Sequence, residues 1–132
     1  MFDKEIIQGK RCHYCHNKTQ FVDSSCIYGK SYGMIYICKP CNAYVGVHKG
    51  TKQALGIVAN KELREAKKKA HYYFDNLWKR AIKNGRQKKE CRSEAYKWLS
   101  KQLNIKPKYT HIGMFDVETC NKVIQICKPY YK

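Results

Sequence analysis

Two C-x-x-C pairs constrain the fold of this chain more than any other feature. Cys12 and Cys15 form the first pair and Cys38 and Cys41 the second, with 22 residues between Cys15 and Cys38. A two-residue spacing lets one turn direct both thiolates at the same ion, and two such pairs complete the tetrahedral Cys₄ shell that zinc favours. The gap slightly exceeds the common 15–20 residues, and a β-hairpin with two turns would fill it. The spacing therefore predicts one zinc ion bound by these four cysteines.

The predicted zinc is structural, because a closed Cys₄ shell leaves no coordination position for a substrate. Iron or an iron–sulfur cluster is the alternative metal. If one of the four cysteines is not a ligand, the substitutes are His13, His16 and Cys26. The first residues, MFDKEIIQGKRC, contain no apolar signal core, so we expect no export and a cytoplasmic protein whose cysteines bind metal or stay free.

We expect the remaining four cysteines to be packing residues rather than nucleophiles: Cys26, Cys91, Cys120 and Cys127. The last three share the stripes of two predicted helices, where a small hydrophobic residue is expected. A second metal site, formed by one or more of these cysteines with a histidine, is the alternative.

Residues 10–59 have the pattern of turns and short strands. Strand-like pieces occur at 21–22, 27–28, 34–37 and 44–47, and the third is the strongest because it is β-branched and aromatic. From Asn60 onward the apolar residues recur at spacings of three and four, which indicates helices.

The helical pattern divides into three segments. The first begins after Asn60 as N-cap and ends near residue 84, before Gly85. The others cover about 90–103 and 117–127, the last with Asp116 as N-cap. We therefore predict an α+β fold in a single domain, residues 1–132. A zinc-ribbon-like hairpin module (10–59) packs on a basic helical part of about three helices (60–132).

Several longer strings carry a resemblance to one family. They are CKPCNAYVGVHKGT at 38–51, ALG at 54–56, AN at 59–60, LR at 63–64, AH at 70–71, FDNLW at 74–78, RSEAYKWL at 92–99 and HIGMFD at 111–116. Together they resemble a bacterial and phage family described as a zinc-finger-containing domain, over nearly the whole chain. The four cysteines match the family's cysteines position by position. Ala54 replaces an expected proline, a small departure at a turn. The resemblance implies the fold and the zinc site, and no established activity.

The charge indicates a polyanionic partner. Lys and Arg number 27 against 10 Asp and Glu, a net charge of +17, and residues 60–110 alone carry +11. Contacts to phosphates release counterions and give sequence-independent affinity, while the eleven tyrosines offer stacking surfaces. We therefore interpret the chain as a zinc-binding protein that binds DNA or RNA mainly through phosphates. The predicted contacts are Lys67, Lys68, Lys69, Lys79, Arg80, Lys83, Arg86, Lys88, Lys89 and Arg92.

Two other functions stay open. His71 and Asp75 lie one helical turn apart, and with His48 and His111 they would form a site for metal-dependent phosphodiester or nucleotide hydrolysis if the fold brings them together. The alternative is that these histidines are structural. A third interpretation is a phage accessory module that binds an acidic host protein. No run of about 18 apolar residues occurs, so we expect no membrane partner. We favour a binding protein over an enzyme.

Overall fold

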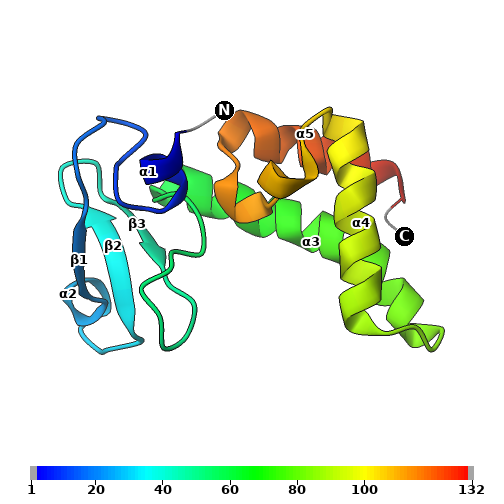
Figure 1. The fold of residues 1–132 in the computed structure, drawn as a ribbon, viewed down its shortest axis with the longest axis horizontal. Coiled ribbons are helices and arrows are strands. Elements are labelled where there is room, and N and C mark those ends of the chain that lie inside the picture. Colours follow the sequence, from blue (N-terminus) through cyan, green and yellow to red (C-terminus); the bar gives the residue numbers. More distant parts are fainter. Residues whose placement is uncertain (1–2, 131–132) are drawn as a thin grey trace. The chain divides into compact units, whose positions relative to one another are not determined.

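A computed structural model of the chain describes residues 3–130, except for the side chain of Ala81. The chain packs as two compact units, the first ending at Arg64 and the second beginning at Glu65. The first unit holds the sheet and the second holds most of the helical residues (Figure 1). The α+β prediction is confirmed. The prediction of a single domain with parts at 10–59 and 60–132 stays a prediction.

Within the described part of the first unit, three antiparallel strands form one sheet in the order β1-β2-β3 (Figure 1). They are β1 (Gln20–Asp23), β2 (Met34–Cys38) and β3 (Ala43–Gly46). The register pairs Gln20 with Ile37 and Cys38 with Ala43. The strands predicted at 21–22, 34–37 and 44–47 are confirmed to within a residue or two at their ends.

Both faces of β2 are buried: Ile35 and Ile37 on one side, and Tyr36 and Cys38 on the other, which carries one buried cluster of the first unit. Cys12, Tyr36, Cys38, Ala43 and Val58 form this cluster. The hydroxyl of Tyr36 donates to the carbonyl of residue 52 at 2.6 Å, which satisfies its polar end inside the core. Two of the metal-ligand cysteines are thus also core residues.

The strand predicted at 27–28 is wrong, because these residues belong to the short helix α2 (Ser25–Tyr28). The side chain of Asp23 accepts a hydrogen bond from the backbone N–H of Ser25 at 2.8 Å and so starts the turn. Gly29 ends it in the left-handed region at φ +70°. Local hydrogen bonds here outweigh the β propensity of an isoleucine–tyrosine pair. Another short helix, α1 (Lys4–Ile7), precedes the first cysteine pair.

Three longer helices follow: α3 (Lys61–Lys83), α4 (Lys88–Leu103) and α5 (Val117–Cys127). All three predicted helices are therefore confirmed. Three 3₁₀ turns, which the sequence did not indicate, join or end them: η1 (Pro107–Tyr109), η2 (Ile112–Met114) and η3 (Lys128–Tyr130).

The helix ends have the predicted caps. The Asn60 side chain accepts a hydrogen bond from the backbone N–H of Leu63 at 3.0 Å, and Asp116 does the same for Thr119 at 2.8 Å. Gly85 adopts φ +90° just beyond α3, a conformation that costs a residue with a Cβ about 1–2 kcal/mol. These caps explain why the helix boundaries were predictable to within about two residues.

The second unit has a core of its own. The ring of Phe74 on α3 is fully buried and lies 4.6 Å from the ring of Tyr96 on α4, and α4 also contacts α5 and η1. Cys91, Cys120 and Cys127 are buried, so their predicted packing role is confirmed. For Cys26 the packing prediction is wrong, because its side chain is exposed on the short helix α2 of the first unit. No helix described in residues 3–130 is long and apolar enough to cross a membrane.

Candidate metal centre

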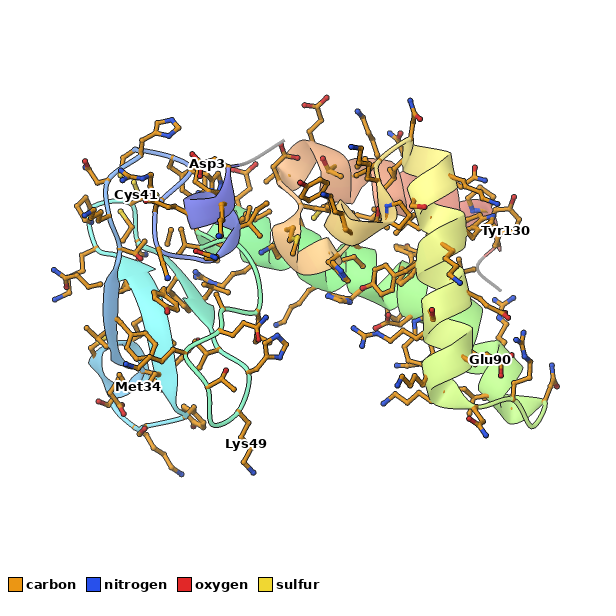
Figure 2. All side chains as sticks on the ribbon, viewed as in Figure 1. Asp3, Met34, Cys41, Lys49, Glu90 and Tyr130 are labelled. Atoms are coloured by element: carbon orange, nitrogen blue, oxygen red, sulfur yellow. The ribbon has the colours of Figure 1, made fainter. Side chains whose placement is uncertain are left out.

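The register of the sheet brings the two cysteine pairs together. The first pair lies in the loop that enters β1, and the second forms the turn from β2 to β3. Because β1 and β2 are antiparallel and Gln20 pairs with Ile37, the start of β1 lies beside the end of β2. Figure 2 shows Cys41 at this end of the sheet and Met34 at the other.

Local hydrogen bonds shape the first loop. The backbone N–H of Cys12 donates to the carbonyl of Asn17 at 2.9 Å, and that of His16 donates to the carbonyl of Cys12 at 2.8 Å. The N–H of Tyr14 points at the sulfur of Cys12, 3.4 Å away. These hydrogen bonds close the turn that carries Cys12 and Cys15.

The two loops share one backbone feature. The residue after the second cysteine of each pair is left-handed, with φ +64° at His16 and φ +50° at Asn42. In each case the chain reverses immediately after the cysteine and leads into a strand. Asparagine and histidine are both found in this region more often than most residues that have a Cβ.

The four sulfur atoms have the spacing that a tetrahedral metal requires. All four lie within 4.8 Å of one another, and the sulfurs of Cys15 and Cys38 are 3.6 Å apart. A Zn–S distance of 2.3 Å gives a tetrahedron edge of about 3.8 Å. Cys12 and Cys38 are buried, while Cys15 and Cys41 are half-buried. In residues 3–130 no other group of three or more His, Cys, Asp or Glu side chains is close enough to hold a metal ion.

The thiols also have the electrostatics of a cation site. Burial and the surrounding thiols raise the pKa of Cys41 to about 12, and burial raises that of Cys38. A hydrogen bond from the backbone of Asn17 lowers the pKa of Cys15 to about 7. Four thiolates at this spacing repel one another, so a divalent cation is what allows all of them to ionise.

The model of the family described as a zinc-finger-containing domain matches residues 8–130. The chain belongs to this family. No curated protein and no solved structure matches it. Together with the sulfur geometry, membership in the zinc-finger-containing domain family assigns one structural zinc ion to Cys12, Cys15, Cys38 and Cys41.

Zinc bound in this zinc-finger domain supplies a tetrahedral cross-link between the loop before β1 and the β2–β3 turn. The substitute ligands considered from the sequence lie outside the sulfur cluster. Cys26 is exposed on α2, and the ring of His13 stacks on Tyr14 at 3.9 Å. His16 is exposed and contributes its backbone to the loop instead.

The polar residues proposed for catalysis lie in different units. Nδ1 of His71 is 3.6 Å from Oδ2 of Asp75, and the indole N–H of Trp78 donates to the other oxygen of Asp75 at 3.0 Å. Burial acts to raise the pKa of Asp75, but the hydrogen bonds from His71 and Trp78 outweigh it, so this pKa lies below its ordinary value. His48 is exposed in the first unit, where its backbone N–H bonds the carbonyl of Gln53. Convergence of all four residues stays a prediction.

His111 belongs to the second unit and lies against a residue that the sequence did not single out. Its ring centroid is 5.5 Å from that of Tyr96, over which the guanidinium of Arg92 lies at 5.6 Å. Burial and the positive charge of Arg92 lower the pKa of His111, so its imidazole is neutral at pH 7. The sequence signal for the contact between Arg92 and Tyr96 was their four-residue spacing, which places both side chains on one side of a helix.

The predicted basic residues differ in their surroundings. Nζ of Lys67 donates to the carbonyl of Gly113 at 2.8 Å, and burial lowers its pKa to about 8, so Lys67 ties α3 to η2. Arg86 forms ion pairs with Glu90 at 3.0 Å and Glu94 at 2.8 Å. Arg80 is half-buried, and the others are exposed: Lys68, Lys69, Lys79, Lys83, Lys88, Lys89 and Arg92.

Proposed function

We propose that this zinc-finger domain binds nucleic acid, mainly through the phosphate backbone. The contacting residues form what we call the basic surface: Lys68, Lys69, Lys79, Arg80, Lys83, Lys88, Lys89 and Arg92. One observation carries the proposal: none of these eight residues forms an ion pair with an acidic side chain described in residues 3–130. Their charges are therefore available to an external polyanion.

The charge balance of the second unit supports the same conclusion. From Glu65 onward the sequence has seventeen Lys and Arg against six Asp and Glu, a net charge of +11. Several of those carboxylates have internal roles, because Glu90 and Glu94 pair with Arg86, and Asp116 caps α5. Phosphates from a bound strand would relieve the self-repulsion that remains.

The arrangement on α3 suits an extended ligand. Lys68, Tyr72, Lys79 and Lys83 follow one another at spacings of four, seven and four residues, so they share one side of the helix. Tyr72 is 54% exposed among these lysines. The rise from Lys68 to Lys83 is about 22 Å. This length matches several consecutive phosphates of one strand.

Neutralising the α3 lysines should weaken binding and flatten its salt dependence. We expect the combined Lys→Gln variant at 68, 69, 79 and 83 to bind a labelled 20-mer at least 100-fold more weakly at 50 mM salt. Each lost phosphate contact should reduce the slope of log K against log salt by about 0.9 for duplex and 0.7 for single strands. Gln keeps helix propensity close to that of Lys, so α3 should stay folded. Fluorescence anisotropy between 50 and 200 mM salt measures both quantities.

The matched control neutralises four exposed lysines of the first unit: Lys10, Lys18, Lys49 and Lys52. This control has the same net charge as the α3 variant. An equal loss of oligonucleotide affinity in both variants would contradict the proposal that the basic surface makes the contacts. A wild-type protein that binds no oligonucleotide would contradict nucleic-acid binding altogether. Polyglutamate of equal charge serves as the competing polyanion, and tighter binding to it would favour an acidic protein partner.

The His71–Asp75 pair favours a second candidate, metal-dependent cleavage of phosphodiesters or nucleotides. The carboxylate of Asp75 lies 3.6 Å from Nδ1 of His71, and the indole N–H of Trp78 donates to its other oxygen, so a histidine and a carboxylate stand side by side as general acid–base catalysis requires. For an enzyme, we expect cleavage of a labelled oligonucleotide with added Mg²⁺ or Mn²⁺ to fall at least 100-fold in the His71→Ala variant. No cleavage by the wild type, or unchanged cleavage by the variant, would reject this candidate.

A further inference from the structure

Three tyrosines lie together on the first unit, outside its core. Tyr28 is 52% exposed and Tyr32 is 72% exposed. Tyr44 is half-buried on β3 and lies on the opposite face of the sheet from Tyr36, because its neighbour Val45 pairs with Tyr36 and successive strand residues face opposite sides. On that face its strand partner is the buried Ile37. These three residues are called the tyrosine cluster below.

The rings have a fixed mutual arrangement. The ring of Tyr28 is perpendicular to that of Tyr32, with centroids 5.5 Å apart, and nearly perpendicular to that of Tyr44 at 6.1 Å. The Tyr28 hydroxyl donates to the Tyr44 hydroxyl at 3.3 Å. An edge-to-face pair covers one face of only one of its two rings, and the exposed fractions of Tyr28 and Tyr32 leave ring surface accessible to a further aromatic partner.

Polar contacts rather than burial hold Tyr32 in place. Its backbone N–H donates to the hydroxyl of the buried Ser24 at 2.7 Å. In the same loop, the hydroxyl of Ser31 donates a hydrogen bond to the carboxylate of Asp23 at 2.8 Å. Gly33 adopts φ +111°, which allows the chain to turn into β2. The loop therefore orders a ring that contributes little to the core. Core packing does not explain this arrangement.

Two cations border the cluster. The guanidinium of Arg64 lies over the ring of Tyr44 at 4.2 Å and donates to the carbonyl of Ala59 at 2.8 Å. Nζ of Lys30 is 6.0 Å from the ring of Tyr32. The nearby carboxylate of Asp23 accepts hydrogen bonds from the backbone N–H of Ser25 and the hydroxyl of Ser31, which lower its pKa. The exposed rings of Tyr28 and Tyr32, beside these cations, match the flat base and the phosphate of an unpaired nucleotide.

We propose that the tyrosine cluster, with Lys30 and Arg64, stacks the unpaired bases of single-stranded nucleic acid. This inference rests on the proposed function and adds to it a preference for single strands. In a duplex both faces of each base are covered by its neighbours, so the cluster cannot stack on it. The bordering positive charges favour a nucleic-acid strand over a proline-rich peptide, the other ligand that exposed aromatic residues bind.

The test compares a labelled 20-nucleotide oligo(dT) with a blunt duplex that has the same number of nucleotides and no unpaired base. We expect the Tyr28→Ala/Tyr32→Ala variant to bind oligo(dT) at least 10-fold more weakly and the duplex within twofold of wild type. The matching Phe variant keeps both rings and should bind oligo(dT) within twofold of wild type. Tyr130→Ala removes a tyrosine of similar exposure (55%) from the second unit and should change neither affinity.

The outcomes separate this inference from the proposed function. If the Ala variant binds oligo(dT) as wild type does, or loses both ligands equally, the stacking role is wrong while backbone binding stands. If the wild type binds neither ligand, the proposed function fails. A Phe variant that binds oligo(dT) as weakly as the Ala variant also overturns the inference. So does a proline-rich peptide that binds through these tyrosines while the affinity for oligo(dT) is unaffected. If the double Ala variant loses zinc, the single variant Tyr32→Ala replaces it in the test, because the ring of Tyr32 is the most exposed of the three and its removal disturbs the fold least.

Discussion

Removing zinc unfolds the first unit and leaves the helices of the second unit folded. The first unit has short strands and a small buried cluster, two members of which, Cys12 and Cys38, are zinc ligands. Structural zinc in small fingers contributes about 10–16 kcal/mol at pH 7, which is comparable to the entire stability of about 5–15 kcal/mol of a typical domain. The second unit has its own buried residues from α3, α4 and α5, so its core does not depend on the metal.

Hydrogen exchange read by mass spectrometry measures this effect segment by segment. After chelation, we expect peptides covering β2 and β3 to lose protection, while peptides from α4 and α5 keep theirs. The Cys38→Ser variant should behave like the chelated protein. Cys26→Ser, which alters an exposed cysteine of the same unit, should behave like the wild type. Full protection of β2 after the metal has been removed would contradict a structural role for zinc.

Replacing Phe74 with Ala should lower the free energy of unfolding of the second unit by about 3–5 kcal/mol. Phe74 is fully buried, and its ring lies 4.6 Å from that of Tyr96, so its loss leaves a cavity between α3 and α4. A loss of this size is a large fraction of the 5–15 kcal/mol that stabilises a typical domain. Urea denaturation followed by circular dichroism at 222 nm measures it.

The control for Phe74 is Lys69→Ala, an exposed position on the same helix. It should change the free energy of unfolding by no more than about 0.5 kcal/mol. If the free energy of unfolding of the Phe74→Ala variant lay within about 1 kcal/mol of the wild-type value, the contact between α3 and α4 would not stabilise the unit.

The zinc ligands and the long helices could be predicted from the sequence, because the decisive signals are local. The C-x-x-C spacing requires no knowledge of the rest of the fold. Asn60, Gly85 and Asp116 mark helix ends through hydrogen bonds and dihedral angles within a few residues. The end of α4 also carries a local signal, the asparagine at position 104. Asn104 adopts φ +56° there, and asparagine is second only to glycine at that position.

Contacts between distant residues could not be predicted in this way. Lys67 belongs to a run of three lysines, and nothing local distinguishes it, yet its ammonium reaches the carbonyl of Gly113, 46 positions away. The tilted ring contact between His111 and Tyr96 likewise depends on how the chain just before η2 is placed beside α4. At 27–28 the error had a local cause, because two apolar residues fit a strand or a helical turn equally well.

The central claim is that one zinc ion, bound by four cysteine thiolates, organises the first unit. Elemental analysis of the purified protein tests it most directly. We expect one zinc per chain in the wild type and in Cys26→Ser, and none in Cys12→Ser or Cys41→Ser. Two zinc ions per chain, or one that persists in both ligand variants, would contradict the Cys₄ site.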